Sequence, residues 1–309
     1  LMTTVAATVN VIPKPVVVNK TKKVKRRQKD QRKRKLNKNV VRGHLSSTET
    51  DEQVHQRVFQ LMKEVYGLNE LEYLEATTPL QFLEAIINKH DVEQDNVAVC
   101  DLGVVVRQYL RWRKFFPRVH PHYAVKAFPD INVVRILHLL GANFDCASRG
   151  EIELALSIGA QPADIIYANP AKGFKHIEFA RDKGVKQMTF DNKAELEKIA
   201  ELFPEAELVL RIASNDSKSL MPFGYKFGCS YAYAIELIDA CKEKGVNLIG
   251  ISFHVGSGCY DASAYVDTLK NAAKLFEYAG KAGFKMDLLD LGGGWPGEED
   301  AIEFFSNNQ

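Results

Sequence analysis

Residues that could carry out chemistry stand where short apolar runs of this sequence end. They are Lys126 after HYAV, Asp145 in NFDCA, Arg211 in ELVLRI, His254 in LIGISFHV and glycines 292–294 after DLLDL. They offer an amine, a carboxylate, a guanidinium, an imidazole and an unhindered backbone turn. If these groups converge, they form a site that can bind an anion and catalyse a reaction on it.

Two glycine-rich segments follow the last two runs. Gly256 and Gly258 flank Ser257 in HVGSG, and three consecutive glycines begin GGGWPG. Without β-carbons, the main-chain N–H groups of such turns can surround a phosphate. Neither segment fits the GxxxxGKS/T or GxGxxG patterns of nucleotide-binding loops. A phosphate site without a dinucleotide signature, facing a lysine at a strand end, suggests pyridoxal phosphate (PLP) as the cofactor.

Each of these residues also has a plainer interpretation. Lys126 could simply end a strand and reach solvent, and His254 could be a core histidine with its hydrogen bonds satisfied. Asp145 and Arg211 could form a structural ion pair. Glycine turns after strands are common, so the residue types alone leave these alternatives open.

Seven apolar runs alternate with segments of helical periodicity. The runs begin at residues 122, 143, 164, 187, 207, 248 and 287. Several helical segments end in a glycine that we expect to cap the helix, namely Gly141, Gly159, Gly184 and Gly245. Strand–helix–strand units of this length predict a parallel sheet, whose carboxyl edge would gather the candidate residues. A closed barrel needs eight strands and a doubly wound sheet does not, so both remain open.

The chain divides into a basic leader and an acidic body. Residues 1–42 hold 14 of the 41 basic residues but one of the 39 acidic residues, which leaves a balance of −11 for the rest. We expect residues 1–53 to be a disordered leader, and 54–309 to be the folded domain, beginning with helices near 54–67 and 80–90. An acidic body disfavours nucleic-acid binding, except through the leader. The leader could also carry nuclear or organellar targeting.

Other composition features bear on membrane insertion, the redox compartment and metal binding. The sequence contains no run of 18 apolar residues, so we expect no membrane span. Five scattered cysteines without a CxxC pair disfavour a disulfide framework and fit a reducing compartment such as the cytoplasm. His120 and His122 form an isolated HxH with no third ligand at a suitable spacing, so we predict no metal site.

Six blocks of this sequence resemble motifs of the eukaryotic ornithine decarboxylase family. They are RVHPHYAVK, NFDCASRGEIELAL (143–156), IIYANPAK (165–172), LVLRIA (208–213), ISFHVGSGC (251–259) and LLDLGGGWPG (288–297). The resemblance implies an α/β fold, a PLP-binding TIM-type (β/α)8 barrel of the alanine-racemase kind, followed by a β-rich C-terminal domain. It therefore favours the barrel over the doubly wound sheet.

The resemblance also implies a role for each matching residue. Lys126 matches the catalytic lysine that binds PLP. Asp145 and Glu151 match acidic residues near that lysine and the cofactor ring. Arg211 matches an arginine beside the ring, and His254 matches the histidine stacked on its face. The phosphate-binding positions are matched by Ser257, Gly293 and Gly294.

The implied activity is that of a PLP-dependent carboxy-lyase acting on a basic amino acid. L-ornithine would give putrescine and CO2, the entry to polyamine synthesis. Lysine, arginine or diaminopimelate as substrate, or a non-catalytic homologue like the antizyme inhibitors, are the alternatives. The family forms homodimers, and an antizyme-type regulator is a possible partner.

Two features depart from the family pattern. An EPGR-type segment, a Cys-Asp motif, a tyrosine of the β-rich domain and the eighth strand do not occur before Gln309. We therefore expect an incomplete barrel of about seven strands, a missing C-terminal domain and a fragment that is inactive alone. The Cys-Asn that usually follows the lysine is replaced by Ala127-Phe128.

Overall fold

The computed structural model describes residues 5–9, 49–68, 72–74, 99–298 and single positions between 78 and 88. They fall into two compact units, one within 1–114 with 135–141 and the other within 115–134 with 142–309. The basic run at 20–42, for which we predicted disorder, lies outside the described residues, as does most of the helix predicted at 80–90.

The first unit contains a small antiparallel sheet that the sequence analysis did not predict. Its strand order is β2 (Glu72–Leu74), β1 (Val5–Val9), β3 (Val99–Asp101). Ala6 lies opposite Tyr73, and Thr8 lies opposite Cys100. Strand β1 falls inside the predicted leader. Its β-branched valines and threonine suit a strand, a local preference that the basic composition of the leader concealed.

Helix α1 (Asp51–Tyr66) begins three residues before the predicted start of order. Thr50 and Gln53 form a capping box, in which Oγ1 of Thr50 accepts from the Gln53 amide at 3.3 Å and Oε1 of Gln53 accepts from the Thr50 amide at 2.8 Å. Val54 is buried as the apolar stripe predicted. The same unit contains α3 (Leu102–Phe115).

The second unit is built on a parallel sheet of seven strands. They are β4 (His122–Ala124), β5 (Asn143–Cys146), β6 (Ile165–Tyr167), β7 (Gln187–Phe190), β8 (Glu207–Arg211), β9 (Asn247–Ser252) and β10 (Leu288–Asp290). All seven predicted runs form strands, which confirms that part of the sequence analysis. Each strand pairs with its neighbours in the sequence, from β4 at one edge of the described sheet to β10 at the other.

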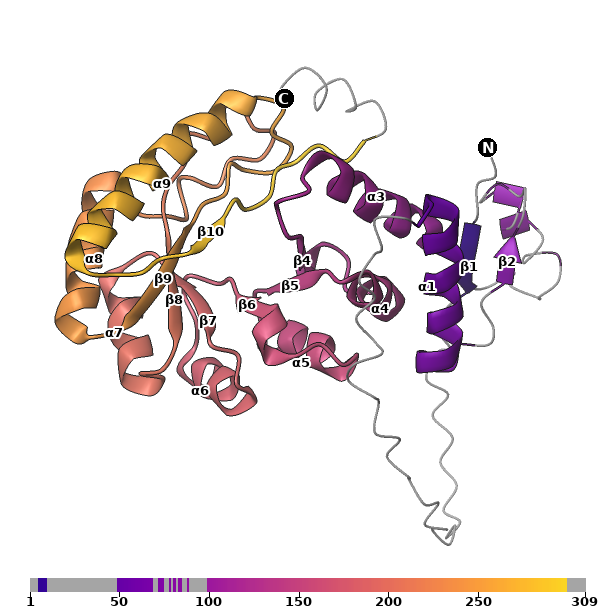
Figure 1. The fold of residues 1–309 in the computed structure, drawn as a ribbon, viewed down its shortest axis with the longest axis horizontal. Helices are drawn as coiled ribbons and strands as arrows, with labels where there is room; N and C mark the ends of the chain where they lie inside the picture. The colour runs from indigo at the N-terminus through magenta and orange to yellow at the C-terminus, as the bar shows by residue number, and fades with distance from the viewer. Residues whose placement is uncertain are drawn as a thin grey trace, which may run out of the picture. The chain divides into compact units, whose positions relative to one another are not determined.

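Helices follow the strands and lie outside the curved sheet in an arc (Figure 1). Their bounds are Ile131–Leu140 (α4), Arg149–Ser157 (α5), Phe174–Lys183 (α6), Lys193–Leu202 (α7), Tyr231–Lys244 (α8) and Ala262–Ala282 (α9). The arc is formed by α5 to α9. Gly184 and Gly245 end α6 and α8 with φ values of 76° and 66°, as predicted for helix caps. None of the described helices is long and apolar enough to cross a bilayer.

The strand order decides between the two architectures that periodicity left open. A doubly wound sheet reverses its strand order and carries helices on both faces, whereas a (β/α)8 barrel adds strands in sequence with helices outside. The described sheet has the second arrangement, so the fold is an incomplete TIM-type barrel of seven strands. The carboxyl ends of its strands lie at one edge.

Candidate active site

Lys126 and Asp145 form an ion pair at the carboxyl edge. Strand β4 leads into a short 3-10 turn, η1 (Val125–Ala127), which carries the lysine. Its Nζ lies 3.2 Å from Oδ1 of Asp145 on the neighbouring strand β5. Burial raises the pKa of Asp145, and the positive charge of Lys126 opposes that rise. The acid therefore pairs with Lys126, and the alternative of a structural ion pair with Arg211 is not what the structure contains.

The residues after Lys126 are the ones that depart from the family pattern. The side chain of Phe128 is half exposed, and its carbonyl oxygen accepts a hydrogen bond of 3.0 Å from the Tyr123 hydroxyl. Ala127 is exposed as well. The substitution thus places an accessible apolar ring two residues from the lysine.

Both carboxylate oxygens of Glu151 accept hydrogen bonds at the start of helix α5. Its Oε2 accepts from the main-chain amide of Ala147 at 2.9 Å, and its Oε1 accepts from the Ser148 hydroxyl at 2.9 Å. Ser148 in turn caps α5 by accepting from the Glu151 amide at 3.3 Å. The carboxylate still raises the pKa of Asp145, so it lies close to the candidate site while it stabilises the loop.

Arg211, Ser252 and Asp290 share one row of the sheet, at the ends of β8, β9 and β10. Burial lowers the pKa of Arg211, and the nearby acids Asp191, Asp290 and Asp145 oppose that shift. Desolvation raises the pKa of Asp290, while the hydrogen bond from the Gly292 amide and the charges of Arg211 and Lys126 oppose that rise. The guanidinium also lies 4.7 Å from the centre of the Phe227 ring.

His254 is held in a neutral form next to these charges. Its Nδ1 accepts a hydrogen bond of 3.1 Å from the Gly256 amide. Burial, together with the positive charges of Arg211 and Lys126, lowers its pKa to about 4. Lys126 follows β4, and the glycine turns follow β9 and β10 of the same parallel sheet, so they share its carboxyl edge. The charge of Lys126 accordingly helps to lower the pKa of both His254 and Asp290.

The triple glycine is packed so closely that side chains are excluded. A β-carbon on Gly292 would lie 2.1 Å from the Phe253 carbonyl oxygen. One on Gly293 would lie 2.8 Å from Nε2 of His254, and one on Gly294 would lie 2.3 Å from the Gly256 carbonyl oxygen. The two glycine-rich segments therefore form one backbone surface, of the kind that a phosphate requires.

The main chain of Ser257 forms two hydrogen bonds with Met221, which lies in the segment between β8 and α8. Its amide donates to the Met221 carbonyl at 3.0 Å, and the Met221 amide donates to the Ser257 carbonyl at 3.1 Å. This bridge fixes the HVGSG turn and leaves the hydroxyl of Ser257, rather than its amide, for a bound phosphate.

The sequence analysis missed two acids at this edge, Asp191 and Asp290. Asp191 follows β7, where its Oδ2 accepts from the Gly228 amide at 3.0 Å. Asp290 ends β10, where its Oδ1 accepts from the Gly292 amide at 2.8 Å. Both acids could have been identified from the sequence, because each stands at the end of an apolar run. Within the described ranges, no three His, Cys, Asp or Glu side chains gather as metal ligands.

The combined geometry fits PLP. An amine paired with a carboxylate, a neutral imidazole, an arginine and a backbone surface that excludes side chains meet at one edge of the sheet. The cofactor requires a lysine for its aldehyde and donors for its phosphate, and these residues supply both.

Comparisons with known proteins agree with this fit. The family model described as "Pyridoxal-dependent decarboxylase, pyridoxal binding domain" matches residues 102–305. A probable ornithine decarboxylase of Dictyostelium discoideum is 47% identical over 220 residues, covering 71% of this chain and 47% of the relative. Antizyme inhibitor 2 of Xenopus laevis is 49% identical over 221 residues, covering 71% of this chain and 48% of the relative. The chain thus spans about half the length of these curated relatives.

A solved structure with the same fold is the arginine decarboxylase of Paramecium bursaria Chlorella virus. It superposes with a TM-score of 0.64 at 35% sequence identity, over 67% of this chain and 58% of that one. This similarity confirms the incomplete barrel and adds an arginine decarboxylase to the proteins that this chain resembles.

Proposed function

The chain belongs to the pyridoxal-dependent decarboxylases, matched through their pyridoxal-binding domain, and from this premise we propose that it forms the cofactor-binding part of an L-ornithine decarboxylase. The products would be putrescine and CO2, and the enzyme would serve polyamine synthesis. The observation that carries the proposal is the Lys126–Asp145 pair, which lies on the same strand edge as His254 and the triple glycine.

We assign a task to each residue of the site. Lys126 would bind the cofactor through its amine, and Asp145 would hold that amine in place from 3.2 Å. His254 stays neutral and would support the ring, because a charged imidazole beside Arg211 and Lys126 is unfavourable. The Gly293 and Gly294 backbone and the Ser257 hydroxyl would hold the phosphate. When bound, PLP accepts the electron pair that remains as CO2 departs.

Further residues would tune this arrangement. Arg211 would lie beside the ring, where its charge is balanced by the acids at the strand ends. Glu151 would shape the loop after β5 by capping α5. A proton delivered to or taken from the substrate amine would pass through Nζ of Lys126, whose side chain is 53% exposed, compared with 25% for its partner Asp145.

Choice of ornithine rests on the relatives rather than on contacts in this chain. The Dictyostelium relative is described as a probable ornithine decarboxylase, and the viral structure is an arginine decarboxylase. Lysine and diaminopimelate remain alternative substrates of the same barrel type. We also propose that the whole protein is a cytoplasmic homodimer, open to an antizyme-type regulator.

A non-catalytic regulator is the second candidate. The observation in its favour is the 49% identity to antizyme inhibitor 2. The residues Lys126, Asp145 and His254 are all present and lie at one edge, which a purely binding protein does not need. We therefore place the enzyme first.

The experiment uses the whole protein from which this chain comes. We expect visible absorbance of lysine-bound PLP, fixation of the cofactor on Lys126 by borohydride, and turnover of ornithine in preference to lysine or arginine. Lys126→Ala should abolish decarboxylation, whereas Lys270→Ala, at an exposed lysine of α9, should not. A Lys126→Ala protein with wild-type turnover would contradict the assignment, and wild-type protein without PLP absorbance would favour the regulator.

A further inference from the structure

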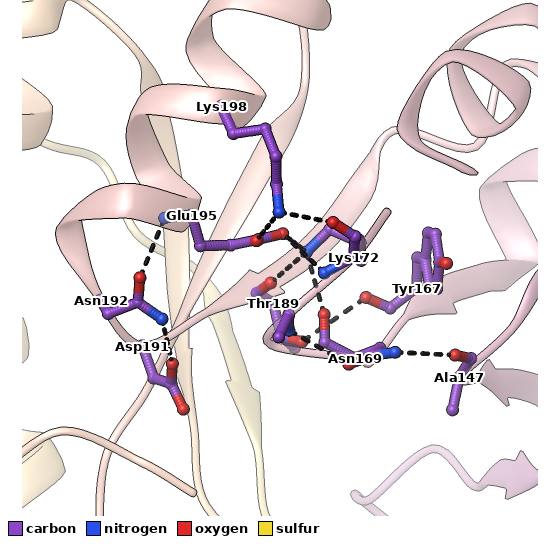
Figure 2. A network of polar contacts seen from close by, with 10 residues as sticks. Ala147, Tyr167, Asn169, Lys172, Thr189, Asp191, Asn192, Glu195 and Lys198 are labelled. Carbon is purple, nitrogen blue, oxygen red and sulfur yellow. Dashed lines mark hydrogen bonds and ion pairs between the residues drawn. The ribbon is translucent and has the colours of Figure 1, made fainter. Parts of the chain in front are cut away.

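A second lysine lies entirely inside the fold, behind the carboxyl edge. Lys172 ends the motif IIYANPAK, and its side chain is 0% exposed, while that of Glu195 on α7 is 3% exposed. Nζ of Lys172 lies 2.9 Å from Oε1 of Glu195. A fully buried lysine is rare because desolvation of the ammonium is costly unless partners compensate for it. Figure 2 shows the cluster of Lys172, Glu195 and Lys198 together with the residues around it.

The partners of Lys172 come from two neighbouring strand ends. Its Nζ donates to the main-chain carbonyl of Asn169, after β6, at 2.9 Å and to that of Thr189, in β7, at 2.7 Å. With Glu195 these make three acceptors, which matches the three donors of an ammonium group. One charge therefore joins the ends of β6 and β7 to helix α7.

Glu195 receives a second ammonium from the same helix. Nζ of Lys198 lies 2.5 Å from Oε2 of Glu195, and it also donates to the main-chain carbonyl of Lys172 at 2.5 Å. The Lys172 amide donates to Oε1 of Glu195 at 3.1 Å. The carboxylate thus holds both the side chain and the backbone of Lys172.

One chain of contacts leads from this cluster to Asp145. The side-chain nitrogen of Asn169 donates to the Ala147 carbonyl at 3.1 Å, and Ala147 follows β5 two residues after Asp145. The Ala147 amide is bonded to Glu151. Figure 2 shows Asn169 pointing from the cluster toward Ala147.

Another chain of contacts leads to Arg211. The Glu195 amide donates to Oδ1 of Asn192 at 2.9 Å, and Nδ2 of Asn192 donates to Oδ1 of Asp191 at 2.9 Å. Asp191 holds the Gly228 amide and raises the pKa of Arg211 against the effect of burial. The cluster is therefore linked to the candidate site through Ala147 after β5 and through Asp191 after β7, on the two sides of β6.

We propose that Lys172 is a positioning residue for the cofactor site, which sets the carboxyl ends of β5, β6 and β7 and through them the surroundings of Asp145 and Arg211. This inference rests on the proposed function, because it assumes that this edge holds PLP. Lys172 does not touch the cofactor or substrate itself, since its ammonium is saturated by protein acceptors and out of contact with solvent.

The electrostatics agree with a holding role. Burial lowers the pKa of Lys172 to about 8, with Glu195 opposing the shift and Lys198 adding to it. Asp191 also raises the value. The ammonium that the three acceptors require is therefore the main form at neutral pH, and its loss at higher pH would free the carbonyls of Asn169 and Thr189.

The test compares Lys172→Met with wild type in the whole protein. Without PLP, amide hydrogen exchange at Ala147 and Gly228 should accelerate in the variant. One contact chain ends on the carbonyl of Ala147, and the other ends on Asp191, whose carboxylate accepts from the Gly228 amide. With PLP, we expect altered absorbance of the lysine-bound cofactor and a kcat lower by on the order of 100-fold, the loss that a displacement of about 1 Å can cause. Lys175→Met, at an exposed lysine of α6, is the matched control and should change neither readout.

A double variant separates positioning from stability. Lys172→Met should lower thermal stability, because it removes one of the two ammonium groups that face the buried Glu195 carboxylate. Lys172→Met with Glu195→Gln removes both charges of the buried pair, and the Gln oxygen can still accept from the backbone amide of residue 172 and from Lys198. We expect the double variant to regain most of that thermal stability while exchange at Ala147 and cofactor absorbance stay abnormal. Full recovery of both readouts would overturn the proposal, because Lys172 would then only neutralise Glu195.

The outcomes also separate this inference from the proposed function. If wild-type protein binds no PLP, the proposed function fails, and the exchange at Ala147 and Gly228 still decides whether Lys172 sets the strand ends. If wild type binds PLP and Lys172→Met shows wild-type exchange, absorbance and kcat, the inference alone is overturned.

Discussion

The imidazole of His254 lies so close to the backbone of Gly293 that a β-carbon there would stand 2.8 Å from Nε2. The same imidazole accepts a hydrogen bond from Gly256 through Nδ1. A histidine from the turn after β9 is thereby clamped between its own turn and the one after β10. The two turns cannot move independently, and the orientation of the ring depends on the absence of a side chain at Gly293.

We expect Gly293→Ala to weaken PLP binding while the fold persists. The new methyl group must displace either the imidazole or the triple-glycine turn. Loss of one hydrogen bond to the charged phosphate costs about 1.5–3 kcal/mol, which is on the order of 10- to 100-fold in Kd. The measurement is PLP titration by absorbance, with far-UV circular dichroism as the check on folding. Gly297→Ala in the same segment is the control, because a β-carbon there meets nothing within 4 Å. Equal affinities for the two variants would contradict the clamp.

The lowered pKa of His254 predicts a specific pH dependence of stability. In the unfolded chain this histidine titrates near its ordinary value of 6.5, whereas in the folded protein its pKa is about 4. Between these values the unfolded state binds more protons, so the free energy of unfolding falls as the pH drops from 6.5 to 4. One such proton contributes at most about 1.4 kcal/mol per pH unit.

His254→Phe should make that slope shallower, because phenylalanine does not titrate. Urea unfolding at a series of pH values measures it, and His176→Phe, at an exposed histidine of α6, serves as the control. If both variants keep the wild-type slope, the imidazole is not held neutral in the folded protein.

Glu151→Ala should destabilise the start of α5, where its carboxylate supports the Ser148 cap. The substitution removes the acceptors for the Ala147 amide and the Ser148 hydroxyl, and the loss of hydrogen bonds to a charged group costs about 1.5 kcal/mol or more. Glu153→Ala on the same helix removes only an ion pair with Arg149 in which both side chains are about half exposed, and should cost less than that. Thermal unfolding compares the two, and an equal loss would show that the cap contributes nothing special.

Much of the barrel could be predicted from the sequence because its signals are local. The inner strands β7 and β8 are buried on both faces and so read as continuous apolar runs, QMTF and ELVLRI, and each connecting helix carries its own periodicity. The small sheet around Val5–Val9 was missed because its pairing with Glu72–Leu74 joins segments far apart in the chain. Such pairing leaves little trace in either segment alone.

The convergence of Lys126, Asp145, Arg211 and His254 followed from the rule that parallel strands share one carboxyl edge. Which groups contact one another did not follow, and the choice of Lys126 rather than Arg211 as the partner of Asp145 required the register of β4 and β5. The buried Lys172–Glu195 pair escaped prediction because a lysine before a helix reads as a solvent-exposed residue. Burial of a charge is a property of the tertiary structure.

Trp295 should report cofactor binding at the triple-glycine turn. Its Nε1 donates to the Gly292 carbonyl at 3.1 Å, and its ring stacks on Tyr265 with centroids 4.1 Å apart. Tyr265 donates through its hydroxyl to the Gly293 carbonyl at 3.2 Å, so both rings are tied to the turn. A phosphate bound there would change the surroundings of the indole, and its fluorescence should fall in a saturable way as PLP is added.

Trp112 is the other tryptophan in these 309 residues, so the whole protein is measured in a Trp112→Phe background. The difference from the same protein carrying Trp295→Phe isolates the signal of Trp295. Pyridoxal without its phosphate should give a weaker response at equal concentration, because the turn would hold only the phosphorylated form. Trp295→Phe in the same background should lose the response while the absorbance of bound PLP persists. If PLP absorbance saturates and the fluorescence of Trp295 stays constant, the phosphate is held elsewhere, and the assignment of Gly293 and Gly294 as its binding positions is wrong.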